Sequence, residues 1–304
     1  MDLNIFEKIK ILDSGMGQEL IARGLVTRGT LWSATSLIDE KYNQLVVDTH
    51  LASINAGADV ILTNTFTTRR VRMEENRVKD KFLFANKKAC ELAIKAKDLS
   101  KKNILIAGSL PAQNNTYEAD KREDNVIEKD FFDQANIISP YIDFFYLDVL
   151  SSGREVKIAL DVIKKLKKPV LVGLHIKKNN KLPSGETITD VVKKNINSSW
   201  LGVVAACVSL EIIESSSDEF KKLDLPFGFK ANLWGVEEPL PVHRFNTPSD
   251  EKAKNPNIIL GKREDISGEI FCEFSKKLIN KGATIIGGCC ETNISHIKEA
   301  AKLK

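Results

Sequence analysis

The chain has 304 residues, 42% of them hydrophobic, so it can bury the core of one large domain or two ordinary ones. Its 45 basic and 41 acidic residues give a net charge of +4, and its lysines are spread along helix-like stretches, which argues against a nucleic-acid partner. No apolar run reaches the ~18 residues that a membrane span needs, and the N-terminal MDLNIFE has no signal-peptide core, so we expect a cytoplasmic protein.

Short apolar runs that are typical of strands recur along the whole chain. They cover residues 9–14, 58–65, 103–109, 143–149, 169–175, 201–207, 226–232 and 283–288. Helix-like stretches separate most of them, for example 43–56 and 81–99, where apolar residues recur at helical spacing. Such alternation implies parallel strands joined by helices, with about 38 residues per unit. The sequence therefore predicts an α/β fold, a single (β/α)8 TIM-barrel domain over residues 1–304.

The competing architecture is a doubly wound open sheet. That fold would favour a glycine-rich phosphate-binding loop after the first strand, and DSGMGQ at 13–18 is a poor match to such a loop. In a barrel, the polar residues that carry chemistry belong at the carboxyl ends of the strands.

Two adjacent cysteines, Cys289 and Cys290, follow the last strand-like run. Neighbouring cysteines do not easily bridge each other, but at the frayed end of a strand both thiolates can reach one metal ion. Cys207 ends the sixth run, which lies two strands away in a closed barrel. Three sulfur ligands with an open fourth position are typical of catalytic zinc, so these cysteines form our candidate zinc site.

The remaining cysteines are interpreted differently. Five cysteines without an export signal indicate reduced thiols or metal ligands rather than disulfides. Cys90 and Cys272 lie in helix-like stretches and are expected to be packing residues. Taken alone, Cys207 could equally be a buried cysteine that packs as a small hydrophobic residue.

A zinc ion with an open position would allow two kinds of chemistry. It could activate a substrate thiol, since a free thiol titrates near ~8.5 and zinc would hold it as a thiolate at neutral pH. It could instead activate water for hydrolysis, with Asp148 or Glu291 as the base, although three sulfurs make zinc a poor Lewis acid. A barrel that binds its ligands without turnover is the third possibility. We favour alkyl transfer to a thiol.

Four segments resemble the homocysteine S-methyltransferases, a family that includes S-methylmethionine-dependent and betaine-dependent enzymes and the homocysteine-binding half of cobalamin-dependent methionine synthase. These segments are ILDSGMGQEL at 11–20, LWSA at 31–34, AGADVILTNTF at 56–66 and GGCC at 287–290. The resemblance spans nearly the whole chain, and GGCC joined to a cysteine that closes the sixth strand is its most specific part. It implies a zinc-bearing (β/α)8 barrel with Cys207, Cys289 and Cys290 as ligands.

The resemblance also implies how the acceptor is held. The family's aspartate on the first strand and its glutamate on the fourth contact the homocysteine amino group, and these positions match Asp13 and Asp148. Asp148 is one methylene shorter than the usual glutamate, so we expect a tighter pocket or an intervening water. Alternatively, each aspartate could cap the following helix. Asn64, Thr65 and Asn232 end other strands at the same rim and are further candidate substrate-binding residues.

The methyl donor is less well defined by the sequence. Trp32 matches the position of one wall of the aromatic cage that holds the quaternary ammonium in the betaine enzymes, although it could simply cover the barrel rim. The tyrosines expected after the second and fourth strands are replaced by Thr67 and Val149, and SLPAQNN at 109–115 replaces the family's GPYG run on the donor side. The chain has no extra domain for cobalamin or folate. We therefore predict a small sulfonium donor, with betaine as the alternative.

Together these expectations describe a methyltransferase of methionine biosynthesis. Its three cysteines act through Zn²⁺, and the methyl group of S-methylmethionine, S-adenosylmethionine or dimethylsulfoniopropionate passes to the thiol of L-homocysteine to give methionine. The enzyme contributes thiolate activation, positioning and a dry pocket. The proline-containing, charged segment 236–262 is long for a loop and could be a lid or an interface, and a homo-oligomer is possible.

Overall fold

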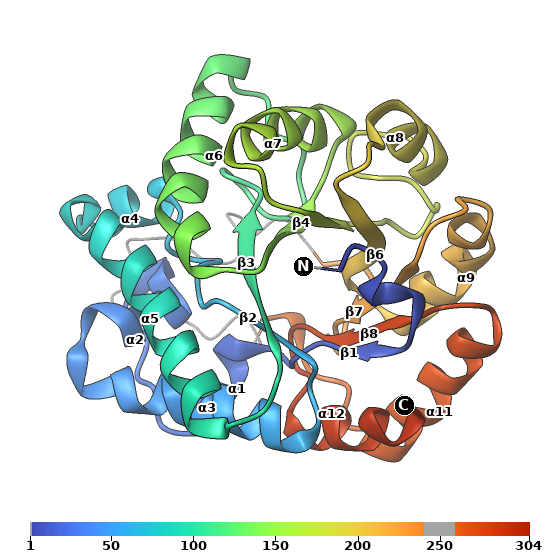
Figure 1. Cartoon of the computed structure of the whole chain (residues 1–304), viewed down its shortest axis with the longest axis horizontal. Coiled ribbons are helices and arrows are strands. Elements are labelled where there is room, and N and C mark those ends of the chain that lie inside the picture. Colours follow the sequence, from blue (N-terminus) through green and yellow to red (C-terminus); the bar gives the residue numbers. More distant parts are fainter. Residues whose placement is uncertain (1, 240–258) are drawn as a thin grey trace.

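Eight parallel strands form the centre of the computed structural model, and helices surround them (Figure 1). The structure describes residues 2–239 and 259–304. Its strands are β1 Lys10–Ile11, β2 Val60–Leu62, β3 Leu105–Pro111, β4 Phe144–Leu150, β5 Val170–Leu174, β6 Trp200–Val208, β7 Phe227–Ala231 and β8 Ile285–Gly288. They follow the order β1-β8-β7-β6-β5-β4-β3-β2, and a parallel bridge between Leu12 and Val60 joins the two ends. The predicted single-domain TIM barrel is confirmed, and the doubly wound alternative is wrong.

The helices lie outside the strands, as a barrel requires. They are α1 Met16–Ala22, α2 Thr35–Ile38, α3 Asn43–Ala56, α4 Arg70–Glu75, α5 Phe82–Ser100, α6 Asp124–Ile138, α7 Gly153–Leu166, α8 Ile188–Asn195, α9 Leu210–Lys221, α11 Gly268–Asn280 and α12 Ile294–Ala300. The predicted helices at 43–56 and 81–99 correspond to α3 and α5. Within the described residues, no helix is both long enough and apolar enough to span a membrane.

Each predicted strand overlaps an observed one, but the boundaries differ. The first run, 9–14, contributes only Lys10–Ile11 to the sheet, and the second, 58–65, only Val60–Leu62. The polar ends of these runs lie beyond the assigned strands at the carboxyl rim, although the Thr63 amide still donates to Ala107 O and the Gly288 amide to Asp13 O, both at 3.0 Å. In contrast, β3 extends two residues beyond its predicted end, to Pro111.

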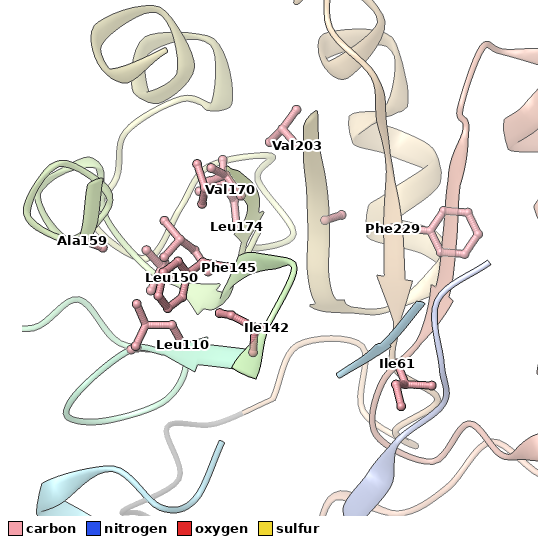
Figure 2. Packing of buried hydrophobic residues seen from close by; sticks show 14 of the residues in the cluster. Ile61, Leu110, Ile142, Phe145, Leu150, Ala159, Val170, Leu174, Val203 and Phe229 are labelled. Atoms are coloured by element: carbon pink, nitrogen blue, oxygen red, sulfur yellow. The ribbon is translucent and has the colours of Figure 1, made fainter. Parts of the chain in front are cut away.

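Alternate side chains of the strands build two separate cores. On β4, Phe144 and Tyr146 belong to the cluster inside the barrel, whereas Phe145 and Leu147 belong to the layer between strands and helices. Figure 2 shows part of this outer layer, which includes Phe145 of β4 and Ala159 of α7. Because side chains alternate along a strand, Asp148 continues the inward series of Phe144 and Tyr146.

The N-terminal segment contributes to the inner core. Phe6, in the short helix η1 Ile5–Glu7, is fully buried, and its ring meets Phe144 edge to face with the centroids 5.8 Å apart. Phe6 therefore packs inside the barrel with residues from several strands. The polar chemistry lies where the strands end, at the opposite, carboxyl rim.

Candidate metal centre and substrate cavity

Three thiols meet at the carboxyl rim of the barrel. The Sγ atoms of Cys207 and Cys290 are 3.6 Å apart, those of Cys289 and Cys290 are 4.0 Å apart, and all three lie within 4.8 Å of one another. Sulfurs that bind one zinc ion tetrahedrally at ~2.3 Å would be about 3.8 Å apart. The donor set and its spacing therefore fit a zinc ion bound by three cysteines.

A β-bulge places Cys207 in this cluster. The register between β6 and β7 shifts between Ala206 and Val208, and Cys207 has a φ of 54°. An extra residue in a strand breaks the alternation of side chains, so Ala206 and Cys207 both belong to the inner core. Asn232 Nδ2 donates to the Cys207 carbonyl at 2.7 Å and so holds the bulge.

Glycines allow the chain to approach the other two cysteines closely. A Cβ on Gly15 would lie 2.3 Å from the Cys289 carbonyl oxygen, and one on Gly288 would lie 2.1 Å from Thr292 Oγ1. Thr292 Oγ1 donates to that same carbonyl at 2.6 Å, and the Cys289 amide donates to Ala231 O at 2.7 Å. The backbone of the cysteine pair is thus fixed by β7, by the start of α1 and by the loop before α12.

The three thiols share one negative charge. Burial opposes ionisation of Cys207, but hydrogen bonds with Cys289, Cys290 and Tyr117 outweigh it and hold the Cys207 pKa well below its usual range. The hydrogen bond with Cys207 in turn raises the pKa values of Cys289 and Cys290. Tyr117 Oη lies 3.1 Å from Cys207 Sγ and can donate to the thiolate. The cluster therefore favours ionisation of Cys207, and the thiolate is the form that a metal binds.

A cavity opens beside the cysteine cluster. Charged and aromatic side chains dominate its wall, together with small polar residues from the strand ends. The charged ones are Asp13, Arg69, Arg72, Asp148 and Lys230, and the aromatic ones are Trp32, Phe66, Tyr117 and Trp234. Such a mixture of apolar walls and a few convergent charges is typical of a small-molecule site.

Asp13 forms a buried ion pair with Lys230. Its Oδ1 accepts from Lys230 Nζ at 2.9 Å and its Oδ2 from the Leu62 amide at 2.7 Å. Although burial disfavours the charge on Lys230, the negative charge of Asp13 and its hydrogen bond hold the Lys230 pKa above the usual value. The interpretation of Asp13 as a helix cap is wrong, because the cap of α1 is Gly15.

Asp148 is the second carboxylate of the cavity. Its Oδ2 accepts from Ser109 Oγ at 2.8 Å. Burial raises the pKa of Asp148 to about 7. The helix-cap interpretation is wrong here too, because Ser152 caps α7.

Comparisons with known proteins identify the family of this chain. The profile described as "Homocysteine S-methyltransferase" matches residues 10–303. The chain belongs to the homocysteine S-methyltransferase family. Its relatives include homocysteine S-methyltransferase 1 of Arabidopsis thaliana, which is 24% identical, with 96% of this chain and 92% of that protein covered. They also include the S-methylmethionine–homocysteine S-methyltransferase of Rattus norvegicus, 24% identical over 97% of this chain and 78% of that protein.

A solved structure supports the fold of the family member described here. The metallated form of the homocysteine methyltransferase MmuM from Escherichia coli superposes with a TM-score of 0.78 at 19% identity. The match covers 98% of this chain and 96% of that one.

In this family member, the other residues predicted to bind substrate divide into two groups. Trp32 and Asn64 line the cavity; the Trp32 ring packs so closely on Gly17 that a Cβ there would lie 2.8 Å from it. Thr65 and Asn232 are buried and do not line the cavity. Thr65 Oγ1 donates to Ser109 O at 2.6 Å, and Asn232 supports Cys207 as described. The direct role predicted for these two in substrate binding stays a prediction.

Sequence reasoning missed several residues of the cavity. Lys230 could have been found, because it is a charged residue at an inward position of an apolar strand. Tyr117, whose ring packs on His175 with centroids 4.6 Å apart, lies in the loop after β3, where the sequence leaves the family's pattern. Phe66 and Trp234 also line the cavity, so Trp32 is accompanied by three aromatic residues rather than standing alone. The predicted segment 236–262 lies largely outside the described residues, and of its described part Leu260 lines the cavity.

Proposed function

We propose that this protein transfers a methyl group from a small sulfonium donor to the thiol of L-homocysteine, giving methionine, and that Cys207, Cys289 and Cys290 hold a zinc ion for this reaction. The observation that carries the proposal is the convergence of the three sulfurs at one end of a cavity lined by aromatic and charged groups. When bound, zinc would supply the positive charge that keeps a substrate thiol ionised at neutral pH.

The carboxylates support recognition of an amino acid acceptor. Asp148 uses only Oδ2 in the hydrogen bonds of the described residues, so Oδ1 can accept from the homocysteine ammonium group. An ammonium group at this position would favour the ionised form of Asp148, whose pKa burial raises to about 7. Asp13 has its charge balanced by Lys230, which makes Asp148 the stronger candidate for this contact.

The aromatic wall supports a methylated cation as the donor. Trp32, Tyr117 and Trp234 present rings to the cavity, and a sulfonium or quaternary ammonium group is stabilised over such rings. The rat relative is named for S-methylmethionine, which favours a sulfonium donor. Betaine remains the alternative because its ammonium group would use the same wall.

A zinc hydrolase has less support. Glu291, one of its two candidate bases, is not part of the cavity wall, and three sulfur ligands reduce the acidity of a metal ion. A cytoplasmic location and a homo-oligomeric state remain expectations from the sequence.

The test is an assay for methionine with purified protein, zinc, L-homocysteine and a donor panel. The panel contains S-methylmethionine, S-adenosylmethionine, dimethylsulfoniopropionate and betaine, and each product is identified by mass spectrometry. We expect methionine from at least one sulfonium donor. Methionine from betaine alone would reassign the donor, and methionine from none would refute the proposed activity.

Metal binding is tested separately with cysteine variants. Cys289→Ala should lose both bound zinc and activity, whereas the matched control Cys272→Ala, in α11 and outside the cluster, should keep both. Stoichiometric zinc in Cys289→Ala would contradict the ligand assignment.

A further inference from the structure

Two arginines with little solvent exposure lie in the cavity wall. Arg69 immediately precedes α4, and Arg72 lies in its first turn; their exposed fractions are 1% and 3%. Arginine is rarely buried so fully unless an anion accompanies it, because the guanidinium stays charged and loses its hydration. This pair has no part in the thiol and ammonium recognition proposed above.

The partners of Arg69 are neutral. Its Nη1 donates to Ala112 O at 2.6 Å, its Nη2 donates to Thr116 Oγ1 at 2.9 Å, and its guanidinium lies 5.2 Å from the centroid of the Phe66 ring. Its buried Nε has no hydrogen-bond partner in the described part of the chain, and no carboxylate there forms an ion pair with it. One edge of the guanidinium, Nε with Nη2, therefore retains donors for a ligand.

Arg72 is only partly compensated. Its Nη1 pairs with Glu75 Oε2 at 2.7 Å, while its buried Nη2 lacks a partner among the described residues. Burial and then the charge of Arg72 push the pKa of Arg69 well below its usual range, and the carboxylates of Glu75 and Asp148 offset this only in part. A carboxylate, which accepts two parallel N–H bonds from a guanidinium, would supply further negative charge and satisfy the free donors.

We propose that Arg69 and Arg72 bind a carboxylate group carried by the methyl donor. The inference rests on the proposed methyl transfer and adds a chemical requirement to it: the donor combines a methylated cation with an anion. A donor that carried only positive charge would be repelled by two buried guanidiniums, and a carboxylate removes this repulsion.

Position favours the donor over homocysteine as the source of the carboxylate. Arg69 packs on Phe66 and is hydrogen-bonded to the loop after β3, the loop that also carries Tyr117. Tyr117 is one of the three rings assigned to the donor cation. A zwitterionic donor would place its cation on the rings and its carboxylate on the guanidinium beside them.

The experiment compares dimethylsulfoniopropionate with its methyl ester, which keeps the sulfonium and lacks the negative charge. If only S-methylmethionine is turned over, that compound and its methyl ester replace this pair. With the unaltered protein, kcat/KM for the acid should exceed that for the ester by about 10- to 100-fold, as expected for a lost charge-assisted hydrogen bond. In Arg69→Met the two values should become similar, mainly through a higher KM for the acid. Because both donors are measured on one preparation, the folded fraction cancels from the ratio.

Arg70→Gln is the matched control. Arg70 is the next residue along the chain, but it pairs with Asp130 and Asp133 and is not part of the cavity wall, so its removal should leave the acid-to-ester ratio unchanged. Arg72→Gln should lower the ratio less than Arg69→Met, because Glu75 already compensates part of its charge.

Two outcomes would overturn the inference. Equal use of acid and ester by the unaltered protein would exclude a carboxylate site while leaving methyl transfer intact. An Arg69→Met variant that raises KM for homocysteine but not for the donor would assign the site to the acceptor's carboxylate. Absence of methionine with every donor would instead refute the proposed function itself. Calorimetric binding of dimethylsulfoniopropionate without homocysteine, weakened in Arg69→Met, gives a second readout that needs no turnover.

Discussion

Replacing Lys230 with methionine should destabilise the protein strongly. Lys230 is 3% exposed, and its Nζ donates to both the carboxylate and the backbone carbonyl of Asp13, at 2.9 and 3.2 Å. Lys230→Met replaces the lysine with an uncharged side chain of similar length and leaves the Asp13 carboxylate buried without its counterion. Removal of one partner from a buried ion pair costs ~3–5 kcal/mol, whereas replacement of both partners is often close to neutral.

The assay is a double-mutant cycle on chemical denaturation of metal-free protein. We expect Lys230→Met to lower the free energy of unfolding by ~3 kcal/mol or more, and Asp13→Asn in the same background to restore much of it. The stabilisation by Lys230 should persist at neutral pH and disappear above its ordinary pKa of 10.5, since the Lys230 pKa is raised in the folded protein. A loss below about 1 kcal/mol for Lys230→Met, or strictly additive single variants, would refute this account of the pair.

Four further outcomes are expected. Glu155, buried at the start of α7, has its pKa raised by burial from 4.5 to about 7, so the unaltered protein should lose roughly 3 kcal/mol of stability as pH rises from 4.5 through 7. Glu155→Gln should lack this loss in pH-dependent denaturation; an unchanged pH profile would contradict it. Gly15→Ala should lower zinc occupancy, measured by metal analysis, because its Cβ would displace the Cys289 carbonyl; an unchanged zinc content would contradict this account. Chelation of zinc should lower the melting temperature, and an unshifted transition would argue against a bound metal. Tyr117→Phe should slow alkylation of the metal-free cysteine cluster, since the hydroxyl stabilises the Cys207 thiolate; equal alkylation rates would refute that role.

The architecture and the cysteine cluster could be predicted from the sequence, and the reasons are physical. The spacing of apolar residues indicates which face of a strand or helix is buried. Regular alternation of strands and helices is compatible with only a few closed folds. The adjacent Cys289 and Cys290 and the distant Cys207 could then be brought together by the rule that all parallel strands end at one rim.

Contacts between segments that are distant in the sequence could not be predicted in the same way. The pairing of Asp13 with Lys230 joins residues 217 positions apart, and no local pattern relates them. The inward direction of Cys207 depends on a bulge with a φ of 54°, which alternation alone would not predict. No sequence pattern singled out Arg69, because its burial depends on contacts with Ala112 and Thr116 in the folded loop after β3.

The cysteine cluster has a consequence for how the chain matures. Cys207 and Cys290 are separated by 83 positions, and the second lies just beyond β8, the strand that pairs with β1 to complete the ring. During synthesis the last two sulfurs therefore emerge after almost every other element, and they reach Cys207 once β7 has paired with both β6 and β8. Metal capture would thus be a late event in the formation of the sheet, and an ion bound there would hold the ends of β6 and β8 together across β7.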